Sequence, residues 1–390
     1  MPPTKALLVS ELFPPAVGGS AVLFDGIYSR LRGADVFVLT DGPATGRPAP
    51  PERRGTVTVM KRPLATRRWG VMDPKGLWQH VRLAAQLRRL TARRRSVVHC
   101  ARALPEGVAA MLAQSFGGPP YVCWAHGEDI ASALTSRELT WLARRVYLGA
   151  TAALANSRNT AAMLAALGVP PSKILVVYPA VDADRFHPGV DGSHVRQRYA
   201  GCDDVMLLSV GRLQRRKGHD VAIRAIASLR EELPNVRYVI AGDGEERARL
   251  ERLAIDEGVQ DRVFFAGTIA DDDLPAYYAA CDVFLLPNRV DDGDIEGFGI
   301  VFLEAAASGK PAIGGDSGGV PEAVERDVTG LLVDGASVDA VTAAVRHLAT
   351  SRPCRERLGR AGRARAQRSF SWQRAAATIS DLQRRVAIDR

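Results

Sequence analysis

The sequence has no apolar run of eighteen or more residues, so no segment of it predicts a transmembrane helix. The run Ala6–Ser10 is too short for the core of a signal peptide and predicts a first buried strand. The five cysteines are scattered, and neither a Cys-x-x-Cys pair nor a His-Glu-x-x-His motif occurs. These absences predict a cytoplasmic protein with reduced cysteines, without a disulfide framework or a structural zinc site.

Two common nucleotide-binding signatures are also missing. A Rossmann oxidoreductase needs Gly-x-Gly-x-x-Gly between a strand and a helix, and a P-loop hydrolase needs Gly-Lys followed by Ser or Thr. Neither pattern occurs in this chain. The sequence therefore argues against both of these enzyme classes.

The composition is that of a globular protein with an excess of positive charge. The 390 residues are 46% hydrophobic and 24% charged, with a formal net charge of +9. This charge suits an anionic membrane surface or an acidic substrate, and an arginine-rich composition explains it equally well. We expect no nucleic-acid partner, and the sequence does not indicate an oligomeric state.

One basic cluster follows a helical pattern. Apolar residues recur at helical spacing over Leu77–Leu90, at Leu77, Val81, Ala84, Leu87 and Leu90. The segment ends in a basic cluster of Arg88, Arg89, Arg93, Arg94 and Arg95. It predicts either a helix lying on an anionic membrane or a solvated helix whose cations favour its C-terminal end.

Short β-rich runs alternate with helical patterns along the whole chain, which predicts an α/β protein with parallel sheets. The first series of strands is Ala6–Ser10, Val36–Leu39, Val57–Met60, Val97–Cys100, Tyr121–Trp124, Ala152–Ala155 and Ile174–Val177. The second series is Val205–Val210, Val236–Ala241, Val263–Ala266, Val283–Leu286, Ala312–Gly314 and Leu331–Val333. We therefore predict two Rossmann-like, doubly wound domains that face a central cleft.

The predicted domain boundaries follow the composition. Residues 1–182 form the first domain, and the Pro- and Asp-rich stretch that begins near Tyr178 predicts a linker at 183–203. Residues 204–370 form the second domain, and a helical tail at 371–390 follows a break at Ser369–Ser371. In open parallel sheets, ligands bind beyond the carboxyl ends of the strands.

The segment from Glu296 to Ala305 carries the strongest functional pattern. Gly297 and Gly299, with Phe298 between them, lie where a helix is predicted to begin, near Ile300. The free amide groups and the dipole at the start of a helix favour a phosphate or a sugar oxygen. Glu304 lies early in that helix, and Glu296 precedes it. Carboxylates accept hydrogen bonds from the hydroxyl pairs of a ribose or a hexose.

A basic loop, residues 211–219, follows the first strand of the second domain. Its residues Arg212 and Lys217 are candidates to bind a diphosphate through charge-assisted hydrogen bonds. A solvated basic turn is the alternative interpretation.

Together these motifs resemble the family 4 retaining glycosyltransferases, which have the GT-B fold. The resemblance rests on Gly211-Arg212 with Lys217-Gly218, on the Gly-Asp-Gly motif at Gly242–Gly244, on Gly267, and on two glutamates eight positions apart. Within that family, segments 294–301 and 315–322 are similar to the bacterial GDP-mannose-dependent mannosyltransferases that act on phosphatidylinositol. The resemblance covers nearly the whole chain.

The resemblance implies a role for each residue. Arg212 and Lys217 would neutralise the diphosphate as it leaves, Glu304 would hold the ribose, and the chain around Gly267 would flank the base. Glu296 would hold the transferred sugar with the amides of Gly297, Phe298 and Gly299. The donor site would include Gly18, Gly19, Gly242, Gly244 and Ile300.

The resemblance also extends to the first domain. The loop at Gly18 and Gly19 would lie near phosphate and acceptor, or would be an ordinary turn between a strand and a helix. His126, after the predicted strand Tyr121–Trp124, matches the family histidine beside the sugar, where its ring would donate to a hydroxyl. The proposed catalytic set is thus His126, Arg212, Lys217 and Glu296.

The expected reaction is transfer of a hexosyl group, with retention, from a nucleotide-diphosphate sugar to a hydroxyl of a lipid, glycan or small molecule. GDP-mannose is the favoured donor and a UDP-sugar is next. No cofactor or metal is expected, because cationic side chains would replace the metal and Asp271–Asp273 predicts a helix cap rather than a metal motif. The alternatives are a nucleotide-sugar epimerase of the same fold and a non-catalytic protein that binds a sugar nucleotide.

Overall fold

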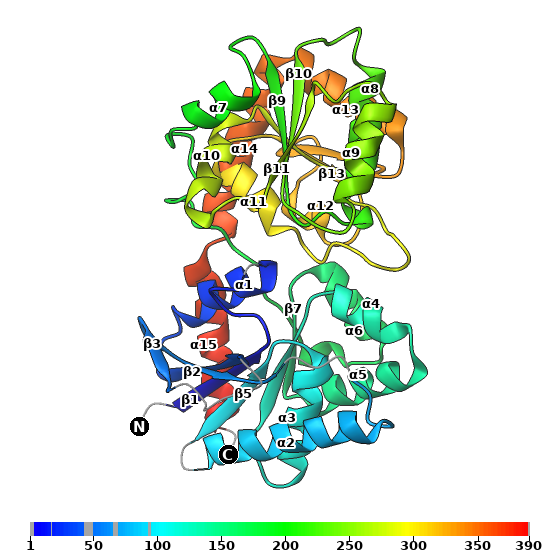
Figure 1. The fold of residues 1–390 in the computed structure, drawn as a ribbon. Coiled ribbons are helices and arrows are strands. Elements are labelled where there is room, and N and C mark those ends of the chain that lie inside the picture. The colour runs from blue at the N-terminus through cyan, green and yellow to red at the C-terminus, as the bar shows by residue number, and fades with distance from the viewer. Residues whose placement is uncertain (1–3, 17, 43–49, 65–68, 93–94, 389–390) are drawn as a thin grey trace. The chain divides into compact units, whose positions relative to one another are not determined.

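The computed structural model of the chain (Figure 1) describes residues 4–16, 18–42, 50–64, 69–92 and 95–388. Its contacts divide the chain into two compact units. The first unit joins Met1–Pro179 with Trp372–Arg390, and the second is Ala180–Ser371. Within the described residues, no helix has the length and apolar character needed to span a bilayer.

In the first unit, the described residues contain an eight-stranded sheet in the order β3-β4-β2-β1-β5-β6-β7-β8. Every neighbouring pair is parallel except β3 and β4. The strands are Thr4–Ser10 (β1), Ala34–Asp41 (β2), Glu52–Arg54 (β3), Val57–Arg62 (β4), Ser96–Cys100 (β5), Tyr121–Ala125 (β6), Ala152–Ala155 (β7) and Ile174–Val176 (β8). Sequence reasoning missed β3, because its three exposed polar residues carry no apolar signal.

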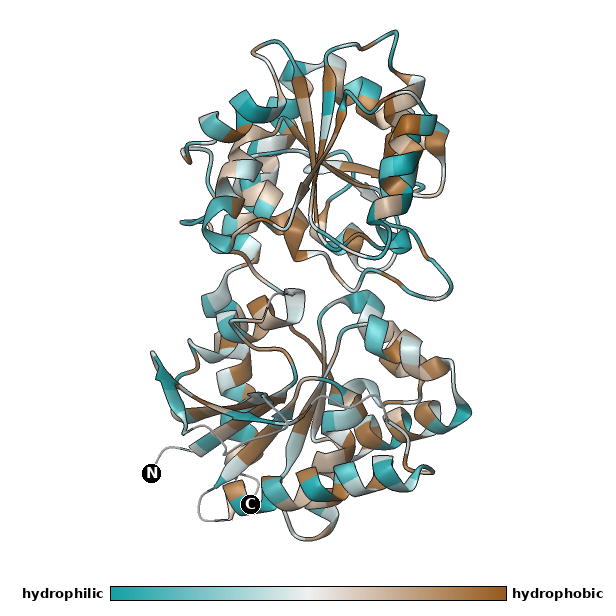
Figure 2. Cartoon of the chain, in the orientation of Figure 1, coloured by the Kyte–Doolittle hydropathy of each residue, from teal (hydrophilic) through white to brown (hydrophobic). Residues whose placement is uncertain are grey.

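Helices pack against both faces of this sheet, and its strands form an apolar band (Figure 2). The helices are Gly19–Tyr28 (α1), Pro74–Thr91 (α2), Val108–Ser115 (α3), Glu128–Leu134 (α4), Arg137–Gly149 (α5), Arg158–Ala166 (α6) and Trp372–Ile388 (α15). Helices α1 and α15 pack so closely that a Cβ atom on Gly26 would lie 2.5 Å from the Trp372 ring. The last helix of the chain is therefore part of the first unit.

A buried chain of hydrogen bonds fixes α15 to the sheet. The indole of Trp124 donates to the Tyr28 hydroxyl (3.1 Å), which donates to Nδ1 of His99 (2.8 Å). Nε2 of His99 then donates to Gln383 on α15 (2.7 Å). Burial lowers the pKa of His99 to about 4, so the ring is neutral and this direction of donation is fixed at neutral pH.

Helix α2 differs from the prediction. Its buried face is formed by His80, Leu83, Ala84, Leu87 and Thr91, whereas Leu77 and Val81 are exposed. The predicted apolar face of this helix was wrong near its N-terminus. Leu77 and Val81 face solvent there, and the adjacent residue His80 is buried instead. Of the predicted basic cluster, Arg93 and Arg94 lie outside the described residues.

The second unit contains, in the described residues, a six-stranded parallel sheet in the order β11-β10-β9-β12-β13-β14. The strands are Val205–Val210 (β9), Val236–Ala241 (β10), Val263–Gly267 (β11), Val283–Leu286 (β12), Ala312–Gly315 (β13) and Gly330–Val333 (β14). The helices are Ser193–Tyr199 (α7), His219–Ser228 (α8), Arg247–Asp256 (α9), Leu274–Ala280 (α10), Ile300–Ala307 (α11), Val320–Ala323 (α12), Val338–Thr350 (α13) and Arg352–Ser369 (α14).

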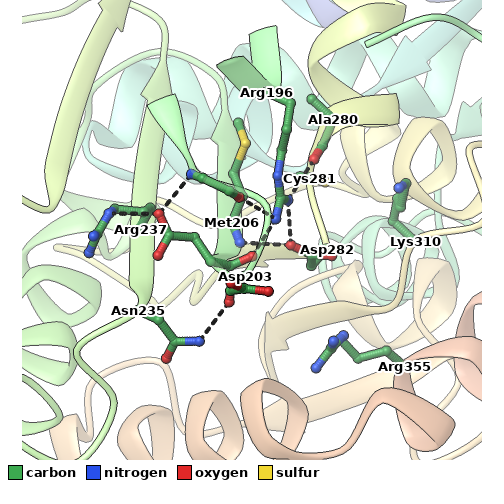
Figure 3. A network of polar contacts seen from close by, with 12 residues as sticks. Arg196, Asp203, Met206, Asn235, Arg237, Ala280, Cys281, Asp282, Lys310 and Arg355 are labelled. Atoms are coloured by element: carbon green, nitrogen blue, oxygen red, sulfur yellow. Dashed lines mark hydrogen bonds and ion pairs between the residues drawn. The ribbon is translucent and has the colours of Figure 1, made fainter. Parts of the chain in front are cut away.

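The segment predicted as a linker, 183–203, is a folded part of the second unit. It contains α7, whose Val195 and Tyr199 are buried. Arg196 on α7 donates to the carboxylate of Asp282 (2.6 Å), which also accepts from the Met206 amide (2.8 Å), as Figure 3 shows. The polar composition of 183–203 predicted a linker. Its polar side chains, such as Arg196, instead bind residues at the amino ends of β9 and β12.

Candidate active site

The site is built on loops at the carboxyl ends of β9 and β12. The first loop contains a 3-10 turn, Arg215–Lys217, and ends at Gly218, which has φ +71°. A Cβ atom on Gly218 would lie 2.1 Å from the carbonyl oxygen of Pro287 in the second loop. Only glycine satisfies both this backbone conformation and this close approach, so the two loops pack directly against each other.

Three side chains converge on one carboxylate oxygen, Oε2 of Glu296. Lys217 donates to it through Nζ, Arg216 through Nη1 (2.8 Å) and Asn288 through Nδ2 (3.1 Å). The Arg216, Lys217 and Glu296 side chains are only 9%, 10% and 12% exposed. Burial alone would raise the pKa of Glu296, but the charges and hydrogen bonds of Lys217 and Arg216 lower it to about 2. Glu296 is therefore ionised at neutral pH.

Sequence reasoning missed Arg216 and Asn288. Arg216 also pairs with Asp294, at 2.9 Å from its Nε. The 3-10 turn directs Arg216 and Lys217 inward and leaves Arg215 exposed. The sequence shows only four cations close together in a loop, and it does not indicate which of them are buried. Asn288 is fully buried, and its Oδ1 has no hydrogen-bond partner among the described residues.

The predicted residue Arg212 lies elsewhere in the same loop. Its side chain is exposed, and Glu296 is bound in the described residues by Arg216 and Lys217 instead. Two of the four cations of this loop, Arg216 and Lys217, are thus held inside the site, and the other two, Arg212 and Arg215, face solvent.

The Gly-Phe-Gly segment lies directly before α11. The helix begins at Ile300, because Gly299, with φ +87°, lies outside the helical conformation. The Phe298 side chain is buried against Phe370, with ring centroids 5.8 Å apart, so only its backbone is available to a ligand. The Gly319 amide binds the carbonyl oxygen of Glu296 (2.9 Å), so the loop after β13 supports the segment.

Glu304 lies on α11 and is 8% exposed. The hydroxyl of Tyr278 donates to its Oε2 (2.7 Å). Burial raises the pKa of Glu304 to about 7, although this hydrogen bond opposes the rise. The group is therefore a carboxylic acid that ionises near neutral pH.

The remaining predicted glycines of the second unit lie at adjacent strand ends. The Gly242 amide donates to the Gly267 carbonyl (2.8 Å), and a Cβ atom on Gly242 would lie 1.9 Å from the Gly211 oxygen. Gly244 approaches Leu213 in the same way. The structure therefore brings the predicted Gly242, Gly244 and Gly267 together beside the basic loop.

The predicted residues of the first unit lie at the carboxyl edge of its own sheet. His126 follows β6; its ring stacks on Trp124 (7° between planes) and meets the edge of Phe24 on α1. Its Nε2 binds the Ala101 carbonyl (2.9 Å) and must donate to it. With this contact, a neutral ring would offer Nδ1 as an acceptor, and the donor role that the family resemblance implies stays a prediction.

Gly18 and Gly19 begin α1 in this first unit. Gly18 has φ +153°, and a Cβ atom on Gly19 would meet no atom within 4 Å among the described residues. The site residues are thus divided: His126, Gly18 and Gly19 belong to the first unit, and Arg212, Lys217, Glu296 and Glu304 belong to the second.

Comparisons with known proteins identify the family of this chain. The family model described as glycosyl transferases group 1 matches residues 196–365, and that of glycosyltransferase family 4 matches residues 17–185. The chain is 33% identical, over 98% of both chains, to a GDP-mannose-dependent alpha-(1-6)-phosphatidylinositol monomannoside mannosyltransferase of Mycobacterium tuberculosis. The protein of the same name from Mycolicibacterium smegmatis is 36% identical over 72% of this chain and 74% of its own.

Solved structures show the same fold. Sucrose-phosphate synthase from Thermosynechococcus elongatus superposes with a TM-score of 0.84 at 21% identity, covering 99% of this chain and 100% of its own. WaaG, a glycosyltransferase involved in lipopolysaccharide biosynthesis, has a TM-score of 0.72 at 20% identity, covering 97% and 99%.

The two parallel sheets, with a basic loop and paired glutamates at the strand ends of the second, define a glycosyltransferase of the GT-B fold. The chain belongs to the family 4 glycosyltransferases. The prediction of fold and enzyme class is confirmed, and the relatives give no support to the epimerase alternative.

Proposed function

We propose that the protein transfers mannose from GDP-mannose, with retention of configuration, to a hydroxyl of a glycolipid acceptor. One observation carries the proposal: the 33% identity to a GDP-mannose-dependent mannosyltransferase extends over 98% of both chains, and so over both units. The charge balance of the basic loop fits the diphosphate of a nucleotide sugar. Its four positive charges, on Arg212, Arg215, Arg216 and Lys217, exceed the two negative charges of Asp294 and Glu296 that pair with it.

In this proposal, Lys217 and Arg216 are held by Glu296 until the donor binds. The exposed Arg212 meets the diphosphate first, and Lys217 then stabilises the charge that develops on it as it leaves. Glu296 accepts hydrogen bonds from the transferred sugar, beside the backbone of Gly297, Phe298 and Gly299. Glu304 accepts from the ribose, and Gly267 flanks the base.

Retention needs no protein nucleophile in this proposal. The leaving phosphate oxygen takes the proton of the acceptor hydroxyl while that hydroxyl attacks the same face of the sugar. The protein contributes position and electrostatic stabilisation. His126, with Nε2 bound to Ala101, accepts from a sugar hydroxyl at Nδ1.

The donor is tested by binding. We expect GDP-mannose to raise the melting temperature more than UDP-, ADP- or TDP-sugars do, because the relatives of this chain are named as GDP-mannose-dependent. At a ligand concentration of a hundred times Kd, the free energy of unfolding rises by roughly 2.7 kcal/mol. Differential scanning fluorimetry in chelator, on the wild type and on Glu304→Ala, measures this. A shift with another nucleotide class would reassign the donor, and no shift with any nucleotide sugar would contradict the proposal.

We also propose that transfer needs no divalent metal, because Arg212 and Lys217 supply the positive charge at the diphosphate. The transfer rate is therefore expected to stay within about twofold when EDTA is added. The measurement is release of GDP from GDP-mannose in metal-free buffer, with and without added Mg²⁺ or Mn²⁺. A strict requirement for added metal, with activity lost in EDTA, would overturn this point.

We further propose that α2 contacts an anionic membrane. Its N-terminal half exposes Trp78 (60%) beside Leu77 and Val81, and interfacial membrane contacts favour such residues. At its other end, Arg88, Arg89 and Arg95 line a hollow of about 870 Å³, together with Val386 and Ala387. Exposed apolar residues and arginines on one helix suit a lipid surface.

The membrane contact is tested with vesicles. Replacing Arg88, Arg89 and Arg95 with glutamine is expected to weaken binding to anionic vesicles by about tenfold, at roughly 1 kcal/mol per cation and partial loss of each contact. Sedimentation with vesicles at 0.1 M salt measures it. The matched control removes three exposed arginines of the second unit, Arg224, Arg252 and Arg360. Equal losses in the two variants would reduce the effect to net charge and contradict a site at α2.

A further inference from the structure

A second polar cluster lies in the first unit, and none of the roles above uses it. Glu11 directly follows β1, and Arg102 follows β5, the strand paired with it. Arg102 donates through Nη2 to Oε2 of Glu11 (2.6 Å), and its Nε lies 3.6 Å from Oε2 of Glu106. Oε1 of Glu106 accepts from the Glu11 amide (3.3 Å). The three residues therefore form one connected group at the carboxyl ends of two central strands.

The cluster adjoins the sugar-binding histidine of the same unit. His126 donates to the carbonyl oxygen of Ala101, the residue before Arg102. The carbonyl oxygen of His126 accepts in turn from Asn156 (3.3 Å), so the end of β5 and the loop after β6 are held in register. The His126 ring is thus bonded to the backbone of the residue directly before Arg102.

Two groups of the cluster remain available to a ligand. The side chains of Arg102 and Glu11 are 25% and 32% exposed. Among the described residues, Oε1 of Glu11 and Nη1 of Arg102 have no hydrogen-bond partner, although the atoms beside them are paired. One ion pair thus keeps an acceptor oxygen and a donor nitrogen for a ligand, and a hydroxyl, which both donates and accepts, can bind to either.

The charges around Arg102 discriminate between ligands. Burial would lower the pKa of Arg102, but the carboxylates of Glu106, Glu11, Asp129 and Glu128 raise it. Four acidic groups therefore act on one guanidinium. Burial raises the pKa of Glu106 to about 7 against the charge of Arg102, so even with Glu106 protonated the corner is acidic. A phosphate would be repelled here, whereas a neutral polyol would not.

We propose that Glu11 and Arg102 form a subsite for a neutral polyol ring of the acceptor, a cyclitol or a hexose. The carboxylate of Glu11 accepts from one ring hydroxyl and the guanidinium of Arg102 donates to a neighbouring ring oxygen. This inference rests on the proposed function, in that the polyol is the acceptor of the transfer. The ring hydroxyls of the acceptor, rather than any phosphate that it carries, then bind at the carboxyl ends of β1 and β5.

The experiment measures polyol binding apart from transfer. Saturation-transfer NMR is recorded with myo-inositol and with methyl α-mannoside on the GDP-saturated wild type, Glu11→Gln and Arg102→Lys. Glu11→Gln keeps the size of the side chain and removes its charge, whereas Arg102→Lys keeps the charge and removes the guanidinium. The matched control is Glu52→Gln on β3, whose side chain is 60% exposed. Melting temperature and GDP affinity are measured on the same samples.

We expect at least one polyol to bind the wild type and the control, and both cluster variants to bind it about tenfold or more weakly, because each loses a hydrogen bond to a charged group. GDP affinity should be unchanged. Absence of polyol binding to the wild type, or equal binding by wild type and variants, would overturn the subsite. Failure of GDP to bind the wild type would contradict the proposed function. Polyol binding by the wild type and the variants would still decide whether the subsite exists.

Discussion

Replacing Glu296 with glutamine is expected to remove at least about 99% of the transfer rate and to lower the free energy of unfolding by about 3 kcal/mol. Arg216 and Lys217 are almost buried and share this carboxylate, so its loss leaves buried positive charge without a partner. Urea unfolding of the second unit and GDP release from GDP-mannose measure the two effects.

The stability effect should depend on pH in a definite direction. The pKa of Glu296 is lowered to about 2 in the folded protein, against about 4.3 in an unfolded chain. The stabilisation is therefore complete above about pH 4.3 and is lost as the pH falls toward 2. The difference in stability between the wild type and Glu296→Gln should shrink over that window.

A matched control is available beside it. Asp294 pairs with the same arginine, but its side chain is 44% exposed. Asp294→Asn should cost under about 1 kcal/mol, since exposed ion pairs contribute little. Equal losses for Asp294→Asn and Glu296→Gln would show that burial of the Glu296 cluster is not the source of its stabilisation.

Glu304→Gln is expected to have opposite effects on stability and binding. The pKa of Glu304 is raised to about 7, so the folded protein binds the proton more tightly than the unfolded chain does. Stability from this group is therefore fully present below about pH 4.3 and is lost as the pH rises through 7. The glutamine variant avoids this loss, and its melting temperature at pH 8 should exceed that of the wild type by several degrees.

The same variant should bind the nucleotide at least tenfold more weakly at pH 8, because a neutral amide replaces a carboxylate that accepts from both ribose hydroxyls. Wild-type affinity should rise between pH 6 and 8 as Glu304 ionises, and the affinity of Glu304→Gln should stay flat. Calorimetric titration with GDP at the two pH values measures this. Parallel pH profiles for the two proteins would contradict a ribose role for Glu304.

Much of the fold could be predicted because buried parallel strands are apolar along their whole length. Strands such as Val205–Val210 and Val236–Ala241 have the predicted bounds. The polar β3 and the folded segment at 183–203 could not be found in this way. Their stability comes from pairing with β4 and from contacts such as Arg196 with Asp282, between residues 86 positions apart.

The candidate site could be predicted in part for a related reason. Glycines and glutamates at fixed spacing identified Glu296 and Glu304, and the family resemblance gave them roles. The 3-10 turn at Arg215–Lys217 decides which cations of the loop are buried. The order of charged residues in the sequence does not predict that turn. Asn288 is a single amide after a strand, and only its burial beside Glu296 marks it.

The hydrogen-bond chain from Trp124 to Gln383 has a consequence for the order of events during synthesis. The second unit, Ala180–Ser371, is one uninterrupted stretch, and all of it is synthesised before α15. The first unit is interrupted, and His99 receives its partner Gln383 only from the last residues of the chain. At roughly 5–20 residues per second, the N-terminal part waits about 10–40 s for its final helix. The half that is translated first is therefore the half whose sequence is completed last, and a chain that ends before Trp372 would contain every residue of the second unit but lack the last helix of the first.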